Sequence, residues 1–244
     1  MTDDGHFNTE IAAHYDDDPA SNDPALIAAT VDVLKGFAAS GPALEFASGT
    51  GRIALPLAAA GVPVTGIEMS RAMVDQMRAK PRGENIPVTI GDMTTAQVDG
   101  TFQLVFLIYN TINNLTTQDA QVACFANAAA HLKPGGAFVV EVGVPQLQRL
   151  PLGERFVPFD VSDTHWGVDE YDVVTQEFSS HHMNIRDGVA QLHSVPFRYV
   201  WPSELDLMAR MAGLRLSQRW ADWTRAPFTE LSRSHVSVWV KDGP

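Results

Sequence analysis

Between residues 43 and 144 the hydrophobic pattern switches repeatedly between two periods. Segments with apolar positions at helical spacing predict helices at 52–60, 71–79 and 118–132. Ser70 is placed to cap the second helix, and Thr116 and Asp119 have capping-box spacing at the third. Strands alternating with helices are typical of a parallel sheet covered on both faces. Short β-branched and aromatic runs predict its strands at 43–47, 62–67, 86–90, 102–108 and 136–143.

The flanking segments follow different patterns. The pattern at residues 7–40 predicts two helices. From 155 to 201 apolar and polar residues alternate with a period of two, which predicts strands at 169–185 and 189–201 joined by a hairpin turn. A helix at 202–214 and two final strands follow. We therefore expect N-terminal helices at 1–40, a main domain formed by 41–150 and 202–244, and an inserted antiparallel segment at 151–201.

Composition and charge narrow the classes of function. With 45% hydrophobic and 19% charged residues, the 244-residue chain is typical of a globular protein. Its net charge of -12 repels a phosphate backbone, so we expect no nucleic-acid partner. The acidic start, MTDDGHFNTE, is unlike a signal peptide, and the longest apolar run, LVFLIY, is too short to span a bilayer. We expect a cytoplasmic protein with no membrane partner.

The stretch ALEFASGTGRIALPLA, residues 43–58, joins a predicted strand to a helix through a glycine-rich turn. Such a turn brings backbone N–H groups against a ligand at the positive end of a helix dipole. It fits the GxGxxA pattern of a dinucleotide-binding turn and also the end of an acidic-x-Gly-x-Gly-x-Gly loop that holds S-adenosylmethionine. Glu68, at the end of the second strand, is suited to bind a ribose in either case.

Three features separate these interpretations. Glu45 lies inside the first strand, where a buried carboxylate needs a cationic or N–H partner, such as the ammonium group of a sulfonium amino acid. Asp92 directly follows the third strand, where it can accept from an adenine amine while Met93 lies against the ring. The LKPGG turn at 132–136 and the two closing strands indicate a seven-stranded sheet with an antiparallel last strand.

Together, Glu45, Gly49, Gly51, Glu68, Asp92 and the HLKPGG segment make the chain resemble the class I S-adenosylmethionine-dependent methyltransferases. The resemblance implies an α/β fold with a Rossmann-like, doubly wound sheet. It also implies S-adenosyl-L-methionine as cofactor and S-adenosyl-L-homocysteine as product. The antiparallel insert is similar to the lid of the small-molecule branch, which includes amino-sugar N-methyltransferases and glycine N-methyltransferase-like enzymes. Ala47 replaces the family's first loop glycine, and its methyl group fits if φ is negative there.

The resemblance also implies which residues bind the cofactor. Tyr15 matches a tyrosine that closes over the cofactor, and Arg52 is placed to contact the cofactor carboxylate. Ordinary packing for Tyr15 and a solvent-facing position for Arg52 are the alternatives. The full set of cofactor-binding candidates is Tyr15, Glu45, Ala47, Gly49, Gly51, Arg52, Glu68, Met69, Asp92, Met93 and Ile108.

Candidates for the acceptor side are fewer. Tyr109 and Asn110 leave the fourth strand where the reacting methyl group lies in this fold, so we expect them to line its path. His181 and His182 are adjacent on a predicted strand and point to opposite faces. We therefore expect no metal site and at most one histidine, as a catalytic candidate, in the pocket.

The end of the insert supplies further candidates for substrate binding. Arg198, Tyr199 and Trp201 would close the lid over the acceptor. Arg198 is suited to bind a substrate carboxylate, and pairing with an acidic residue of the lid is the alternative.

The expected reaction is in-line methyl transfer to a nitrogen or oxygen of a small-molecule acceptor. An amine must be neutral when it attacks, whereas a hydroxyl acceptor usually needs a base, for which Tyr109, His165, His181 and His182 are candidates. A NAD-dependent oxidoreductase is an alternative that leaves Glu45 and Asp92 unexplained. A non-catalytic cofactor-binding module is a third, suggested only by Ala47. A small molecule is the expected partner, and a homodimer is an open option for the assembly.

Overall fold

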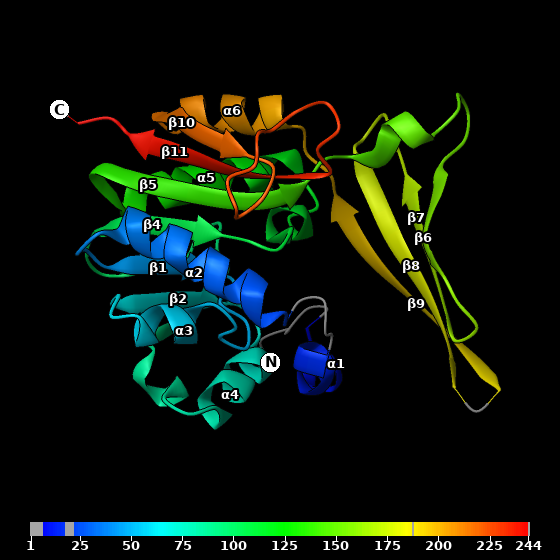
Figure 1. Ribbon diagram of the computed structural model, residues 1–244, viewed down its shortest axis with the longest axis horizontal. Helices are drawn as coiled ribbons and strands as arrows, with labels where there is room; N and C mark the ends of the chain where they lie inside the picture. The colour runs from blue at the N-terminus through cyan, green and yellow to red at the C-terminus, as the bar shows by residue number, and fades with distance from the viewer. Residues whose placement is uncertain (1–6, 18–21, 187, 244) are drawn as a thin grey trace.

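The computed structural model describes residues 7–17, 22–186 and 188–243, which form two separate sheets (Figure 1). The larger sheet has the strand order β10-β11-β5-β4-β1-β2-β3. Its strands are β1 (Ala43–Phe46), β2 (Val64–Glu68), β3 (Val88–Ile90), β4 (Phe102–Leu107), β5 (Leu132–Gly143), β10 (Leu214–Trp220) and β11 (Ser234–Lys241).

Most strand pairs in this sheet are parallel. β1 pairs in parallel with β2 and β4, β2 with β3, and β4 with β5, whereas β11 is antiparallel to both β5 and β10. The predicted α/β fold with seven strands and an antiparallel last strand is therefore confirmed. Because β1 to β5 point the same way, their carboxyl ends share one edge of the sheet, the edge at which doubly wound folds bind ligands.

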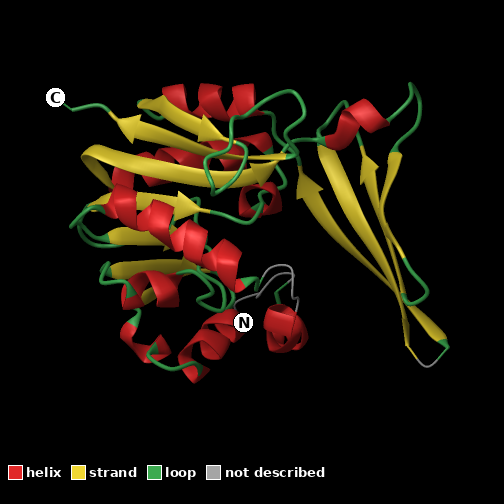
Figure 2. Ribbon diagram, viewed as in Figure 1, coloured by secondary structure: helices red, strands yellow, loops and turns green. Residues whose placement is uncertain are grey.

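Helices cover both faces of the larger sheet, as Figure 2 shows. Ser70 caps α4 as predicted, because its hydroxyl accepts the N–H of Met73 at 3.1 Å. Thr117, and not Thr116, caps α5 by accepting the N–H of Ala120 at 3.1 Å. The helices are α1 (Thr9–His14), α2 (Pro24–Ala38), α3 (Ala54–Ala59), α4 (Arg71–Ala79), α5 (Gln118–His131) and α6 (Pro202–Met211). Short 3-10 turns are η1 (Tyr15–Asp17), η2 (Gly83–Asn85), η3 (Thr111–Asn114) and η4 (Gln146–Arg149).

Strand side chains alternate between two hydrophobic cores. In β4, Val105 and Leu107 belong to the core shared with α5 and α6, while Leu104 and Phe106 belong to the core shared with α2 and α3. All four are buried. Each such side chain contributes roughly 1.5–3 kcal/mol when it leaves water. Burial on both faces explains why the central strands are continuous apolar runs in the sequence.

The smaller sheet, called the second sheet below, is an antiparallel meander in the order β6-β7-β8-β9. Figure 1 shows it beside the edge toward which β4 and β5 point. Its strands are β6 (Phe156–Val161), β7 (His165–Tyr171), β8 (Glu177–Arg186) and β9 (Val189–Arg198).

The single strand predicted at 169–185 is wrong, because a turn divides it into parts of β7 and β8. The Asp172 carboxylate accepts the N–H groups of Val174 at 2.7 Å and Thr175 at 3.1 Å, and Gln176 has a φ of +64°. A side chain that captures backbone donors in this way competes with the sheet ladder. Within the described ranges, no helix is both long and apolar enough to cross a membrane.

Candidate active site

Glu68 fixes the loop that follows β1. The N–H of Gly49 donates to one oxygen of its carboxylate at 2.8 Å, and the N–H of Ser70 donates to the other at 2.9 Å. The residue is buried at the end of β2. Two backbone donors fix the direction of the carboxylate, as recognition of a ribose at this position requires.

Gly51 serves the packing of the loop. Its φ is +78°, and a Cβ placed there would lie 2.7 Å from Cγ of Met77 and 3.0 Å from Cγ of Leu55. Gly51 therefore lets α3 and α4 approach each other, and it does not line the cavities described below.

Ala47 has a left-handed backbone conformation. Its φ is +52°, so the condition under which its methyl group fits without strain, a negative φ, is not met. A left-handed conformation brings the Cβ of an L-residue close to its own backbone, which costs about 1–3 kcal/mol outside glycine. The backbone at position 47 thus has a conformation that favours glycine, although the residue is alanine.

Replacing Ala47 with glycine is expected to raise the free energy of unfolding by about 1 kcal/mol. Relief of the strain exceeds the extra chain entropy that glycine brings to the unfolded state. Chemical unfolding of the two proteins measures the difference. The control is Ala58→Gly in α3, where glycine should instead destabilise by roughly 0.5–1 kcal/mol. An unchanged or lower stability for Ala47→Gly would show that the loop is not strained.

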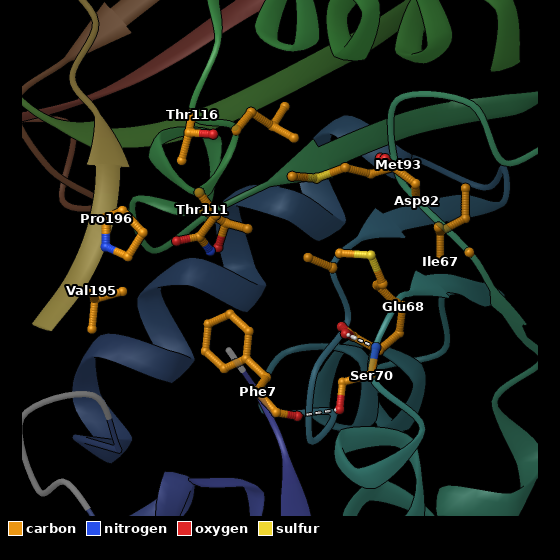
Figure 3. A pocket seen from close by; sticks show the side chains of 15 residues that line it. Phe7, Ile67, Glu68, Ser70, Asp92, Met93, Thr111, Thr116, Val195 and Pro196 are labelled. Atoms are coloured by element: carbon orange, nitrogen blue, oxygen red, sulfur yellow. Dashed lines mark hydrogen bonds between the residues drawn. The ribbon is translucent and has the colours of Figure 1, made fainter. Parts of the chain in front are cut away.

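The first cavity, of about 210 Å³, lies over the carboxyl ends of β1, β2 and β3. Glu68, Met69, Asp92 and Met93, all named from the sequence, line it together with Ala47. Figure 3 shows Glu68, Asp92 and Met93 around one space, with Phe7 on the opposite side from Met93. Asp92 is exposed and accepts the N–H of Thr94 at 2.8 Å, while Met93 is buried. The cavity therefore offers two carboxylates and apolar side chains, as adenosine binding needs.

A smaller cavity, of about 30 Å³, lies beside the glycine-rich loop. Glu45 lines it and is 4% exposed, and its Oε2 atom has no hydrogen-bond partner. Burial raises the pKa of Glu45 well above its ordinary value, although the charge of Arg52 opposes this. A buried carboxylate oxygen without a donor is costly. The ammonium group of a sulfonium amino acid would supply both the donor and the countercharge, so these residues fit S-adenosylmethionine. The other sequence-named residues that line this cavity are Tyr15, Ala47, Gly49, Arg52, Ile108 and Tyr109.

The large cavity, of about 670 Å³, separates the main sheet from the second sheet. Tyr15 from η1 and Tyr109 and Asn110 from the end of β4 line it on one side. His182 on β8 and Tyr199, directly after β9, line it on the other side. Thr111 lines all three cavities. A group bound in the first cavity can therefore meet a molecule bound in the large cavity near Thr111.

Tyr109 and Asn110 form a strained turn at the end of β4. Their φ angles are +57° and +61°, so two consecutive residues are left-handed. The partly buried Glu141 holds the turn, because its carboxylate accepts the N–H of Tyr109 at 3.0 Å and the indole N–H of Trp223 at 2.8 Å. Burial raises the pKa of Glu141, and these two hydrogen bonds oppose the shift. The guanidinium of Arg52 lies 4.1 Å from the centre of the Tyr109 ring. Arg52 therefore packs on this ring in a cation–π contact and does not simply extend into solvent.

Three candidates for the acceptor side lie elsewhere. His181 is on the other face of the second sheet, where it contacts Glu170 and Ser194. Arg198 is buried, donates to Glu204 at 2.8 Å and to Gln121, and does not line the large cavity. Trp201 packs against the small apolar cluster at the base of the second sheet and does not line the large cavity.

Several cavity residues were not predicted. Thr111 gives no sequence signal beyond its position after β4. On β8, the alternation of side chains around His182 would have identified Ser180 and Phe178 as facing the same way. Asp169 and Tyr171 on β7 follow the same rule, but they require the turn at 172–176 to be recognised first.

Metal binding finds no support in the part of the chain that the structure describes, where no group of three or more His, Cys, Asp or Glu side chains could hold an ion.

Known proteins resemble the chain along nearly its whole length. Residues 43–136 match a family model described as a methyltransferase domain. The structure of the CcbJ methyltransferase from Streptomyces caelestis is 36% identical with a TM-score of 0.85, covering 98% of this chain and 99% of that chain. The cypemycin N-terminal methyltransferase of Streptomyces sp is 29% identical over 203 residues, 80% of this chain and 81% of that protein.

A more distant structure shares the fold. CalS10 from Micromonospora echinaspora, an amino pentose methyltransferase solved with S-adenosylmethionine bound, is 21% identical with a TM-score of 0.67 over 97% of this chain and 98% of that chain. Neither these proteins nor the site supports the alternative of a NAD-dependent oxidoreductase, which leaves Oε2 of the buried Glu45 without a hydrogen-bond partner. The chain uses S-adenosylmethionine as its cofactor and belongs to the class I S-adenosylmethionine-dependent methyltransferases.

Proposed function

We propose that the enzyme methylates a nitrogen atom of a small-molecule amine held in the large cavity. The observation that carries this proposal is Asp169, a carboxylate on the wall that the second sheet contributes. Ser180 on β8 is directly opposite it in register, and Tyr171 lies two residues further along β7 on the same cavity wall. Burial raises the pKa of Asp169, and the hydrogen bonds from Ser180 and Tyr171 oppose the shift.

Aromatic rings line the same cavity as this carboxylate. Tyr171 stacks on Phe178 with ring centroids 5.4 Å apart, Phe178 stacks on Phe197 at 5.0 Å, and Tyr199 lies 5.7 Å from Tyr171. Ring faces and a carboxylate together suit a cationic amine, which gains from both cation–π attraction and a charge-assisted hydrogen bond. A carboxylic acid as acceptor would be repelled by Asp169.

The cofactor, when bound, supplies a methyl group on a positively charged sulfur. Glu68 would hold the ribose hydroxyls, Asp92 and Met93 the adenine, and Glu45 the ammonium group. The second sheet would act as a lid, which positions the acceptor and keeps water from the site. Tyr109 and Thr111 would line the approach of the acceptor nitrogen.

The comparisons support an amine acceptor. The cypemycin enzyme is named for methylation at an N-terminus, and CalS10 for an amino pentose. Both names refer to amine-bearing acceptors, of very different sizes. The large cavity, rather than the shared fold, would decide which amine this enzyme takes.

Replacing Asp169 with asparagine is expected to raise KM for an amine about 10- to 100-fold, because a charge-assisted hydrogen bond worth about 1.5–3 kcal/mol is lost. Transfer of radiolabelled methyl groups to a panel containing an amino sugar, a short peptide with a free N-terminus, a phenol and a carboxylic acid measures the effect. The control is Asp163→Asn in the turn between β6 and β7. Turnover of the phenol or the acid, and not of either amine, would contradict the proposal.

A further inference from the structure

One face of the second sheet carries a line of hydrogen-bonding side chains. Ser180 and His182 on β8 line the large cavity. His165 on β7 pairs in register with Asn184, two residues from His182, so the two histidines are diagonal neighbours on the same face. Asp160 on the next strand, β6, lies beyond His165.

These four side chains are in continuous contact. Ser180 Oγ lies 3.2 Å from His182 Nε2, His182 Nδ1 lies 3.1 Å from His165 Nε2, and His165 Nδ1 lies 2.5 Å from Asp160 Oδ2. The side chain of His165 is 25% exposed and that of Asp160 is 48% exposed. The line therefore begins at the cavity wall and ends in solvent.

One arrangement of protons in this line places three on the two rings. When the Ser180 hydroxyl turns to Asp169, its register partner on β7, the contact with His182 requires a proton on His182 Nε2. The contact with the Asp160 carboxylate requires a proton on His165 Nδ1. One further proton lies between the two rings. Two imidazoles with three protons share one positive charge between the carboxylates of Asp160 and Asp169.

A neutral pair has a second arrangement that satisfies these three contacts. With two protons, His165 donates to Asp160, His182 donates from Nδ1 to His165, and Nε2 of His182 accepts from Ser180. Ser180 then turns its hydroxyl from Asp169 toward His182. The line can thus take up a proton at its cavity end and release one at its solvent end.

We propose that the His165–His182 pair removes the proton that an ammonium acceptor must lose before it can be methylated. The proposal rests on the amine function proposed above. The N–H bond of the ammonium breaks and leaves its electron pair on nitrogen, and the proton passes through Asp169 and Ser180 to the histidine pair. The neutral nitrogen then bonds to the methyl carbon while the carbon–sulfur pair goes to sulfur. One proton leaves to solvent at Asp160 in each turnover.

Other ionisable groups near the pair are few. On the same face, Asp169 and Tyr171 lie beyond Ser180, and His193 on β9 is directly opposite His182 in register. The opposite face carries His181 with Glu170, which also pairs with Arg155.

The first test is the pH dependence of methyl transfer to the amine with the highest turnover in the panel above. His182→Gln and His165→Gln are expected to lower kcat/KM about 100-fold at neutral pH, the range of general base catalysis. The deficit should shrink as the pH approaches the range in which the free amine is already neutral. His181→Gln, on the other face, should keep the wild-type profile. A deficit of equal size at every pH would indicate a structural role and overturn the relay.

The second test needs neither cofactor nor acceptor. In protein labelled with ¹⁵N at histidine, the ring signals of His165 and His182, assigned with the two variants, should change together at one pH. In Asp160→Asn this shared change should be altered, because His165 Nδ1 loses the carboxylate that accepts its proton. Two rings that titrate independently, or a change unaffected by Asp160→Asn, would overturn the relay even if amines are methylated. Coupled rings in an enzyme that methylates no amine would overturn the proposed function instead, and with it the acceptor side of the relay.

Discussion

Replacing Glu68 with alanine is expected to weaken binding of S-adenosylhomocysteine about 100-fold or more. The variant loses the ribose-binding carboxylate. It also leaves the N–H groups of Gly49 and Ser70 without their acceptor, so the loop after β1 is no longer held to the start of α4. Each hydrogen bond between the Glu68 carboxylate and a ribose hydroxyl contributes about 1.5–3 kcal/mol, because the acceptor is charged. The loss of two such bonds accounts for an affinity about 100-fold weaker. Isothermal titration calorimetry measures the affinity.

The matched control for this experiment is Glu84→Ala. Glu84 is an exposed residue of η2, and its removal should leave the affinity for S-adenosylhomocysteine unchanged. A thermal melt of each protein separates a local effect from unfolding. Wild-type affinity in a folded Glu68→Ala protein would remove Glu68 from the binding site.

Replacing Arg198 with methionine is expected to lower the free energy of unfolding by about 3–5 kcal/mol, because Glu204 is left as a partly buried charge without its partner. Chemical denaturation measures this change. The double variant Arg198→Met/Glu204→Met should recover much of the loss, since it removes both charges. Arg215→Met is the control, because its pair with Asp242 is largely exposed and is worth at most about 1 kcal/mol.

The same pair predicts a pH dependence. Burial opposes the ionisation of Glu204, but hydrogen bonds from Gln176, Gln118 and Arg198 outweigh it and hold its pKa below the ordinary value. A carboxyl with a lowered pKa stabilises the fold above its unfolded pKa of about 4.3, and that contribution disappears as the pH falls through the folded pKa. Stability of the wild type should therefore decline below about pH 4.3 more steeply than that of Arg198→Met. An identical acid profile for both proteins would contradict this role of the pair.

The ends of the central strands were predictable from the sequence because burial on both faces leaves a strong signal. An apolar run followed by a single acid, as at Glu68 and Asp92, marks where a buried strand reaches the ligand-binding edge. Glu45 was informative for the opposite reason, since an acid inside such a run needs a specific partner. The cofactor side of the site followed from these local patterns.

The acceptor side was less predictable because it depends on contacts between distant segments. Arg198 looks like a surface arginine in the sequence, and only the approach of α5 and α6 shows that Gln121 and Glu204 bind it. The positive φ of Ala47 was also hidden, because the sequence alone gives no measure of strain tolerated in a loop. The contact between His165 and His182 requires the register between β7 and β8, which depends on the turn at 172–176 that the predicted single strand at 169–185 missed.

The place of the second sheet in the chain has a consequence for folding. Ser234 in β11 pairs with Gly143 in β5, and the whole second sheet lies between them in sequence. Neighbouring strands of that sheet close short loops, whereas insertion of β11 beside β5 closes a long one at a higher entropic cost. We expect the hairpins of the second sheet to form first, which shortens the flexible chain that β11 must close. Amide hydrogen exchange during refolding would then protect β8 and β9 before β11, so that the acceptor wall is assembled ahead of the completed cofactor-binding sheet.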